Sequence, residues 1–286
     1  MAQETKGSVA SGWKEMDTEV FEEMSRYIYS RCRIKLPPIK RTMLSSRISR
    51  RLRATGLKGY RQYFEYIKTL PDNDPEIMLM IDAVTTHKTE FFREEDQFDF
   101  LRQEVLPGAG TEQFRVWSAG CSSGEEVYTL AMVLEEYHRK KKALIYSVLG
   151  TDIATDMLRQ GLNAVYSQRS IAPIRQELQR EYLLRGTGCK SGLFRIVPEL
   201  RRKVEFRRFN LTDAGAWDFD KKFDVIFCRN VIIYFDKMTQ KALFTRFYRS
   251  LRSGGYLFIG CSETLHGVDA GFVPAGISVY RKPHDS

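Results

Sequence analysis

A glycine-containing segment between a predicted strand and a predicted helix is the first part of the chain that could bind a ligand. The strand, residues 114–118, leads through Gly120 and Gly124 into a helix that begins with Glu125 and Glu126. Glycines let the backbone approach a ligand, and a helix N-terminus presents free N–H groups. A phosphate site would need GxGxxG spacing or Lys-Ser/Thr after the last glycine. Two carboxylates instead suit a cationic or hydroxyl-rich ligand, although an ordinary turn with acids at a helix N-terminus would look the same.

Polar residues also follow three further predicted strands at their carboxyl ends. Asp152 ends the second strand, Asn210 and Leu211 follow the third, and Arg229 and Asn230 follow the fourth. Open α/β sheets bind ligands at this edge, where an acid at a strand tip can take a ribose diol. A lone Asp at such a position is also common as a helix cap. Four consecutive strands that end in this way predict a ligand site rather than four separate caps.

These segments, together with one upstream motif, resemble the chemotaxis receptor methyltransferases (the CheR family). The resemblance is carried by SAGCSSGEE at 118–126, Thr151-Asp152, FDVIFCRNVIIYFD at 223–236, and the motif Thr86-His-Lys-Thr-Glu-Phe-Phe-Arg93. Members of the family use S-adenosylmethionine to esterify glutamate side chains of bacterial chemoreceptors, with S-adenosylhomocysteine as the second product. The resemblance spans most of the chain, and it implies the same activity and cofactor here.

The resemblance also implies a set of cofactor-binding residues: His87, Thr89, Arg93, Gly120, Glu126, Asp152, Asn210, Leu211, Arg229 and Asn230. Asp152 would bind the ribose hydroxyls, and Asn210 and Leu211 would neighbour the adenine. Arg229 and Asn230 would close the floor of the site, while the motif from Thr86 to Arg93 would reach over the cofactor. Relatives usually have Asn where His87 stands, and an imidazole can still donate or accept one hydrogen bond.

The expected chemistry agrees with the lack of a nucleophile–base constellation in the chain. Methyl transfer from a sulfonium is an in-line displacement, and a glutamate with a pKa of about 4.3 is already ionised near pH 7. No general base is required, so the enzyme must mainly align the reactants. We expect Arg93 and Tyr234 to be catalytic by positioning the incoming carboxylate beside the methyl group. By position alone, Tyr234 would otherwise be an aromatic side chain packed on the apolar run 231–233.

The elements that must position these residues alternate between short apolar runs and amphipathic helices, which predicts a mostly parallel sheet with crossover helices. Strands are expected at 114–118, 144–150, 204–209, 223–228, 256–260 and 277–281. Helices are expected at 125–141, 154–161, 171–184 and 238–251. The glycine-rich stretch 185–206 predicts a small antiparallel insert. The resemblance makes this a Rossmann-like class I methyltransferase sheet with a β-subdomain, which in some relatives binds a tethering peptide at the receptor C-terminus.

The N-terminal region carries most of the net charge of the chain. Of the formal +9, residues 1–70 hold +8, from 15 basic and 7 acidic side chains. We expect a flexible segment at 1–16, a basic all-helical domain at 17–70, a linker at 71–93 and the methyltransferase domain at 94–286. Four arginines, Arg47, Arg50, Arg51 and Arg53, could form a solvated helix face or a nucleic-acid surface. Exposed aromatics and a recognition motif are lacking, which argues against nucleic acid. The resemblance implies a third use, docking on acidic receptor helices, and we favour it.

Other features of the sequence exclude further classes of protein. The five cysteines are odd in number with no CxxC pair, and the four histidines are scattered, which argues against disulfides and a metal site. No signal peptide or membrane span is evident, so we expect a cytoplasmic monomer that is recruited to membrane receptor arrays, with no nucleic-acid partner. A nicotinamide-dependent oxidoreductase is disfavoured by the missing GxGxxG. A non-catalytic cofactor sensor with a basic nucleic-acid- or protein-binding domain remains the alternative.

Overall fold

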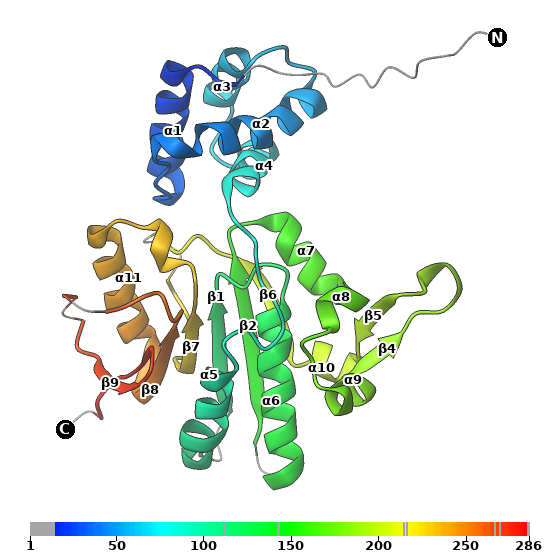
Figure 1. Cartoon of the computed structure of the whole chain (residues 1–286). Coiled ribbons are helices and arrows are strands. Elements are labelled where there is room, and N and C mark those ends of the chain that lie inside the picture. Colours follow the sequence, from blue (N-terminus) through cyan, green and yellow to red (C-terminus); the bar gives the residue numbers. More distant parts are fainter. Residues whose placement is uncertain are drawn as a thin grey trace. The chain divides into compact units, whose positions relative to one another are not determined.

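The computed structural model divides the chain into two compact units (Figure 1). It describes residues 15–110, 113–141, 144–213, 215, 217–265, 267–268 and 270–284. The first unit comprises the chain up to Ser30 and Leu36–Val84, and the second comprises Arg31–Lys35 and the chain from Thr85 onward. Most of the predicted flexible segment 1–16 lies outside the described residues. Its last residue, Met16, is buried and donates its N–H to Ser45 Oγ at 3.0 Å.

The first unit is all-helical, as predicted. Its elements are α1 (Thr18–Cys32), a 3-10 turn η1 (Pro38–Lys40), α2 (Arg41–Thr55), α3 (Tyr60–Thr69) and α4 (Pro75–Val84). Asp17 caps α1 by accepting the N–H of Val20 at 2.8 Å. The predicted apolar stripe of α2, which consists of Leu44, Ile48 and Leu52, is fully buried.

Helix α4 lies where the sequence predicted a linker, so the first unit extends further than expected. The turn-like run 71–75 predicts a boundary, but Pro75 begins a helix and Asp74 directly precedes it. Asp74 accepts the N–H of Glu76 at 2.7 Å, and proline is well suited to the first helical position. Ile77, Met80, Ile81 and Val84 form a buried stripe at helical spacing. That stripe makes α4 part of the helical core.

The second unit contains the predicted open and mostly parallel sheet. Its strand order is β6-β2-β1-β7-β8-β10-β9, and only β10 and β9 are antiparallel to their neighbours. The strands are β1 (Phe114–Ala119), β2 (Tyr146–Asp152), β6 (Val204–Arg208), β7 (Phe223–Cys228), β8 (Leu251–Ile259), β9 (Val273–Gly276) and β10 (Val279–Arg281). Strand β7 has the predicted bounds, β9 was not predicted, and the other strands shift at one or both ends. The α/β fold class is therefore confirmed.

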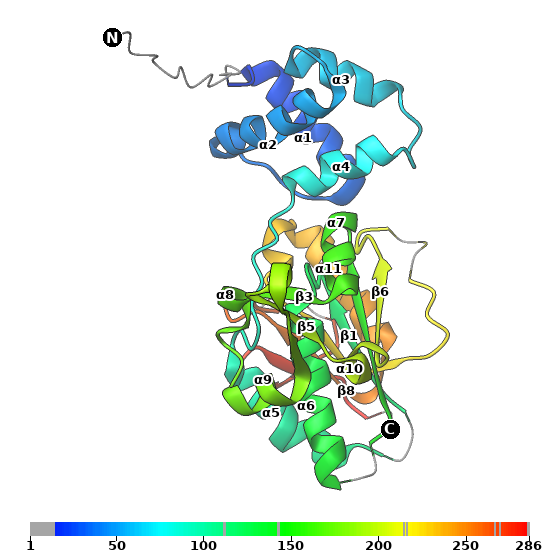
Figure 2. The ribbon, with the colours of Figure 1, turned by 90° about the vertical axis from the view of Figure 1, so that its right-hand side faces the viewer.

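Helices cover both faces of this sheet (Figure 2). They are α5 (Glu95–Phe100), a π-helical turn η2 (Leu101–Val105), a 3-10 turn η3 (Leu106–Gly108), α6 (Glu125–Lys141), α7 (Thr155–Asn163) and α11 (Lys237–Ser250). Alternation along β1 divides the core: Val116 packs with the apolar residues of α5 and α6, and Trp117 packs with those of α11. A strand buried on both faces in this way belongs in the middle of a doubly wound sheet.

A second, three-stranded antiparallel sheet forms the predicted insert, but with different bounds. Its order is β3 (Val165–Ser167), β5 (Leu193–Ile196), β4 (Leu183–Arg185), interspersed with α8 (Gln168–Ile171), α9 (Gln176–Tyr182), a 3-10 turn η4 (Gly188–Lys190) and α10 (Pro198–Arg201). The predicted range 185–206 omits β3 and includes the start of β6. Pro173 interrupts the helix predicted over 171–184, and three-residue β3 is defined only by its pairing with β5.

Candidate functional site

The parallel register brings four loops to one edge of the large sheet. Ala119 pairs with Thr151, Ser118 with Phe227, and Cys228 with Ile259, so β1, β2, β7 and β8 end side by side. The order β2-β1-β7 places β1 at the topological switch point of the sheet. Open α/β sheets have a crevice for ligands at this point. One edge of the sheet therefore carries the predicted residues of the glycine segment together with Asp152, Arg229 and Asn230.

The turn after β1 is held between the neighbouring loops. The N–H groups of Gly120 and Cys121 donate to the carbonyl of Thr151 at 2.7 and 2.9 Å. Gly120 has φ +85°, and a Cβ there would lie 2.4 Å from Cγ2 of Val231. Any side chain at this position would push apart the loops after β1 and β7. Glycine is thus required here by backbone geometry and by close approach.

Asp152 acts as an anchor for the turn after β1. One carboxylate oxygen accepts the N–H of Ser122 at 2.8 Å, and the other accepts the N–H of Ala154 at 2.9 Å. Burial raises the pKa of Asp152 despite these hydrogen bonds and the nearby His87. A carboxylate has about four acceptor positions, so each oxygen can still accept a ligand hydroxyl. Asp152 is not the cap of α7, whose N-cap residue is Ala154 without a side-chain cap, and its ribose role stays a prediction.

The motif from Thr86 to Arg93 is attached to the same turn. Ser122 Oγ donates to the carbonyl of His87 at 3.0 Å, and the His87 ring lies 2.8 Å from Thr85 Oγ1. Arg93 donates from Nη1 to the carbonyl of Lys88 at 3.1 Å. The flanking residues Phe92 and Glu94 adopt left-handed backbone conformations with φ of 55° and 58°. Thr89, another predicted cofactor residue, is partly exposed in this segment.

Arg229 is the centre of a buried polar network and only 2% of its side chain is exposed. Its Nε donates to Glu126 Oε2 at 2.7 Å, and its Nη1 donates to the carbonyl of Arg93 at 2.8 Å and to Gln97 Oε1 at 3.1 Å. Glu94 approaches Nη1 to 3.6 Å. The guanidinium joins the loop after β7, the start of α6 and the segment before α5. Such a planar fork suits several acceptors at once.

Glu126 is bonded on both oxygens, since Ser118 Oγ also donates to its Oε1 at 2.6 Å. The two predicted cofactor residues Glu126 and Arg229 thus bond to each other, and their contact with a ligand stays a prediction. Sequence reasoning missed Gln97 and Glu94 in this network. Glu94 stands next to Arg93 and could have been noticed, whereas buried Gln97 gave no signal in a helix of ordinary polarity.

The loop after β7 carries Asn230 and ends in the 3-10 turn η5 (Ile232–Tyr234). Asn230 is left-handed with φ 58°, and its N–H donates to Glu263 Oε2 at 3.0 Å. Glu263, on the loop after β8, is the third residue that sequence reasoning missed. Tyr234 is partly exposed, and its hydroxyl has no hydrogen-bond partner within the part of the chain that the structure describes. The phenol is available to a substrate.

Asn210 and Leu211 follow β6, and Asn210 meets the segment Arg31–Lys35. Asn210 Nδ2 donates to the carbonyl of Arg31 at 2.9 Å, and its Oδ1 accepts the N–H and hydroxyl of Thr212. Leu211 is buried beneath this loop. The N–H of Lys35 donates to the carbonyl of Tyr234 at 3.3 Å. Residues 31–35 therefore belong to the surroundings of two predicted site residues.

The four arginines predicted to dock a partner separate into two pairs in the first unit. Arg51 forms a two-pronged pair with Glu76, at 2.9 and 2.5 Å. Arg47 Nη1 donates to the last carbonyls of α4, with Val84 O at 3.1 Å. Both therefore hold α4 against α2, and their docking role stays a prediction. Arg50 and Arg53 are exposed and can still serve that purpose.

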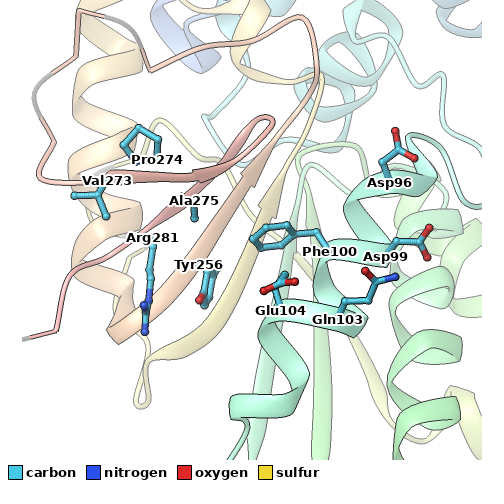
Figure 3. Close-up of a pocket in the computed structure, with 10 residues that line it drawn as sticks. All are labelled: Asp96, Asp99, Phe100, Gln103, Glu104, Tyr256, Val273, Pro274, Ala275 and Arg281. Atoms are coloured by element: carbon cyan, nitrogen blue, oxygen red, sulfur yellow. The ribbon is translucent and has the colours of Figure 1, made fainter.

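A hollow of about 740 Å³ lies elsewhere on the second unit, between α5–η2 and the strands β8, β10 and β9 (Figure 3). Phe100 and Tyr256 form its floor with ring centroids 6.2 Å apart. Its helical side carries Asp96, Asp99 and Glu104. None of the predicted site residues lines this hollow. It is separate from the carboxyl edge of the sheet.

No helix in the described ranges is both long enough and apolar enough to cross a membrane.

Comparisons with known proteins cover both units. Residues 19–85 match the family model for the all-alpha domain of CheR methyltransferases, and residues 87–280 match the one for their SAM binding domain. The chemotaxis protein methyltransferase of Borreliella burgdorferi is 36% identical, over 86% of this chain and 89% of that protein. Its Escherichia coli counterpart is 35% identical, over 93% and 91%. The solved structure of PKMT2 from Rickettsia typhi in complex with AdoHcy matches at TM-score 0.37 and 15% identity. The match covers 61% of this chain and 26% of that one.

Proposed function

The chain belongs to the CheR methyltransferase family, and from this premise we propose that it methylates glutamate side chains of bacterial chemoreceptors. S-adenosylmethionine is its cofactor, and the chain is a methyltransferase of the SAM-dependent class. The products of the proposed reaction are glutamate methyl esters and S-adenosylhomocysteine. The observation that carries the proposal is the convergence of Asp152, the glycine turn and the Tyr234 loop on the carboxyl edge of one sheet.

The residues at this edge fit the cofactor. Asp152 retains acceptor capacity for the ribose hydroxyls, and Gly120 lets the loops after β1 and β7 lie close together beside it. Asn210 and Leu211 would border the adenine, and Asn230 would close the floor. When bound, the sulfonium supplies an electrophilic methyl group. Glu126 and Arg229 would act on this site mainly by fixing the surrounding loops. Glu126 bonds Arg229 and the Ser118 hydroxyl, and Arg229 also bonds the Arg93 carbonyl and Gln97.

The role of the chain in the chemical step is alignment. A substrate glutamate is ionised near neutral pH, so no proton would have to be removed before it accepts the methyl group. Tyr234 would donate its unpaired hydroxyl to the carboxylate. The Arg93 guanidinium bonds only the Lys88 carbonyl among described residues, so further donors remain for the same purpose. Holding reactants in such an arrangement can lower the barrier by roughly 7–11 kcal/mol.

Docking and location complete the proposal. Arg50 and Arg53 would steer the chain to acidic receptor helices, and the chain would work in the cytoplasm as a monomer at membrane receptor arrays. A tethering peptide at the receptor C-terminus would bind the β3–β5–β4 sheet. The support for this is that the small sheet exposes three apolar side chains, Val165, Leu184 and Leu193. Such side chains suit a peptide that adds a strand at an exposed edge.

The proposal is tested with labelled S-adenosylmethionine and receptor-containing membranes, by scoring base-labile methyl ester released as methanol. We expect ester formation by the wild-type chain and a large loss of rate in Tyr234→Phe and in Arg93→Ala. Tyr66→Phe, at an exposed tyrosine of the first unit, is the matched control. If both site variants stay within twofold of wild type, the roles of Tyr234 and Arg93 are wrong. Tight cofactor binding without ester on any receptor would favour the sensor alternative.

A further inference from the structure

We propose that Glu263 is a positioning residue for the methyl transfer, which fixes the loop that presents Asn230 and Tyr234. This inference rests on the proposed function, since it gives the loop after β7 a part in the reaction. Glu263 follows the carboxyl end of β8, directly beside the end of β7. Only 7% of the residue is exposed. No cation pairs with its carboxylate among the described residues.

The carboxylate of Glu263 is bound entirely by backbone N–H groups. Its Oε2 accepts from Gly260 at 2.7 Å and from Asn230 at 3.0 Å, and its Oε1 accepts from Ile233 at 3.2 Å. A buried carboxylate without a cation is costly unless such bonds compensate it. Burial still raises the pKa of Glu263 above its ordinary value. All of these bonds go to the loops after β7 and β8. Glu263 therefore holds these two loops in position relative to each other.

The bonds act on the part of the loop that needs support. Asn230 is in the left-handed region, which a non-glycine residue occupies only when its surroundings hold it there. The turn η5 that bears Tyr234 has no side-chain cap of its own, and the N–H of Ile233 lies at its start. Glu263 supplies the missing acceptor. It thereby connects the conformation of Asn230 to that of Tyr234.

Gly260 permits this arrangement. A Cβ at Gly260 would lie 2.7 Å from Asn230 Nδ2 and 2.9 Å from Glu263 Oε2. An alanine at this position would therefore displace the loop after β7 without changing any charge. The backbone of Gly260 does not need a left-handed conformation, so Gly260→Ala disturbs mainly this contact. It serves as a second variant that reaches the same loop by another route.

The test compares Glu263→Gln and Gly260→Ala with Asp224→Asn. A glutamine has one acceptor oxygen and one donor NH₂, so it cannot accept from both Asn230 and Ile233. Asp224 is the control, because it is also a buried carboxylate that accepts a backbone N–H, from Arg115 at 2.7 Å. It lies at the opposite end of β7 and, unlike Glu263, also pairs with Arg252 at 2.6 Å. We expect hydrogen exchange in residues 229–235 to rise at least tenfold in both site variants and to stay unchanged in the control.

In the transfer assay, we expect kcat to fall about 100-fold in Glu263→Gln, as a misplacement of about 1 Å can cause. Adding Tyr234→Phe to Glu263→Gln should then cost much less than Tyr234→Phe costs alone, because the two residues act through one loop. Additive effects, or exchange in 229–235 that is unchanged in the site variants, would overturn the inference. A wild-type chain that makes no ester refutes the proposed function instead, while hydrogen exchange still decides whether Glu263 holds the loop.

Discussion

The two units of the chain use arginine in different ways. In the second unit, Arg229 is almost completely buried, and its guanidinium bonds acceptors at the start of α6 and in residues 93–97. In the first unit, Arg50 and Arg53 are exposed and form no ion pair within the described residues. The buried arginine holds loops of the candidate site together, whereas the exposed arginines leave their charge in solvent.

The arginine–glutamate pair of α2 and α4 lies between these extremes. The Arg51 side chain is 20% exposed and that of Glu76 is 11% exposed, and Tyr63 also donates its hydroxyl to Glu76 at 2.8 Å. This pair stabilises the helical unit and presents little charge to the outside. Residue type alone is therefore a poor guide to function in α2, since Arg51 pairs with Glu76 while its neighbour Arg50 is exposed to solvent.

The largest effect is expected from Arg229→Ala. Removing one partner of a buried ion pair costs about 3–5 kcal/mol, because Glu126 and Glu94 would be left without their cation. We expect the unfolding free energy of the second unit to fall by this amount in urea titrations, with loss of S-adenosylhomocysteine binding in calorimetry. Arg50→Ala should change neither quantity. A change in stability below about 1 kcal/mol would mean that the network is not what holds these loops.

A smaller loss is expected from Arg51→Ala in the first unit. Glu76 keeps the Tyr63 hydroxyl but loses its two-pronged partner, so we expect about 1–3 kcal/mol of destabilisation. Thermal unfolding of the helical unit would measure it, with Lys58→Ala as the exposed control. The affinity for S-adenosylhomocysteine should stay as in wild type. A loss of cofactor affinity would contradict the expectation that cofactor binding depends on the second unit alone.

Reversing charge at the exposed positions should affect only the partner. For Arg50→Glu with Arg53→Glu we expect the KM for receptor to rise about tenfold, equivalent to about 1.4 kcal/mol, without loss of stability. The increase should shrink at high salt, because screening acts over about 8 Å at physiological ionic strength. Lys58→Glu is the control within the same unit. Equal losses of receptor and cofactor binding would refute a docking role.

The smallest effect concerns the pH response of Asp152. Its raised pKa means that its contribution to stability is present below the ordinary value of about 3.9 and is lost as pH rises through the folded-state pKa. Ionisation over the same interval should strengthen ribose binding. We therefore expect cofactor affinity to increase while the stability contribution declines. Asp152→Asn should bind more weakly and lack this response when both quantities are measured against pH.

Much of the fold was predictable because its elements are defined by local pattern. Helix α6 and strand β7 have the predicted bounds, since each is an uninterrupted periodic or apolar run. Strand β3 and helix α4 were missed for different reasons. Strand β3 exists only through its pairing with β5, and the start of α4 has the same residue types as a turn.

The candidate site was predictable in its position but not in its internal bonding. Strand ends and the family resemblance brought together Gly120, Asp152 and Asn230, which the structure places at one edge. Their roles toward the cofactor stay predictions. Glu263 and Gln97 were missed because their importance lies in backbone groups that they bind across the fold. A sequence does not show which N–H a buried side chain will meet.

The five residues Arg31–Lys35 make the second unit discontinuous along the chain. They separate the two parts of the first unit in sequence. The carbonyl of Arg31 nevertheless accepts a hydrogen bond from Asn210, and the N–H of Lys35 donates to the carbonyl of Tyr234. A truncated chain that begins at Thr85 would therefore lack part of its own catalytic unit. A chimera that takes its helical unit from a relative has to keep these five residues with the second unit. Such a chimera therefore cannot be made with a single junction in the sequence.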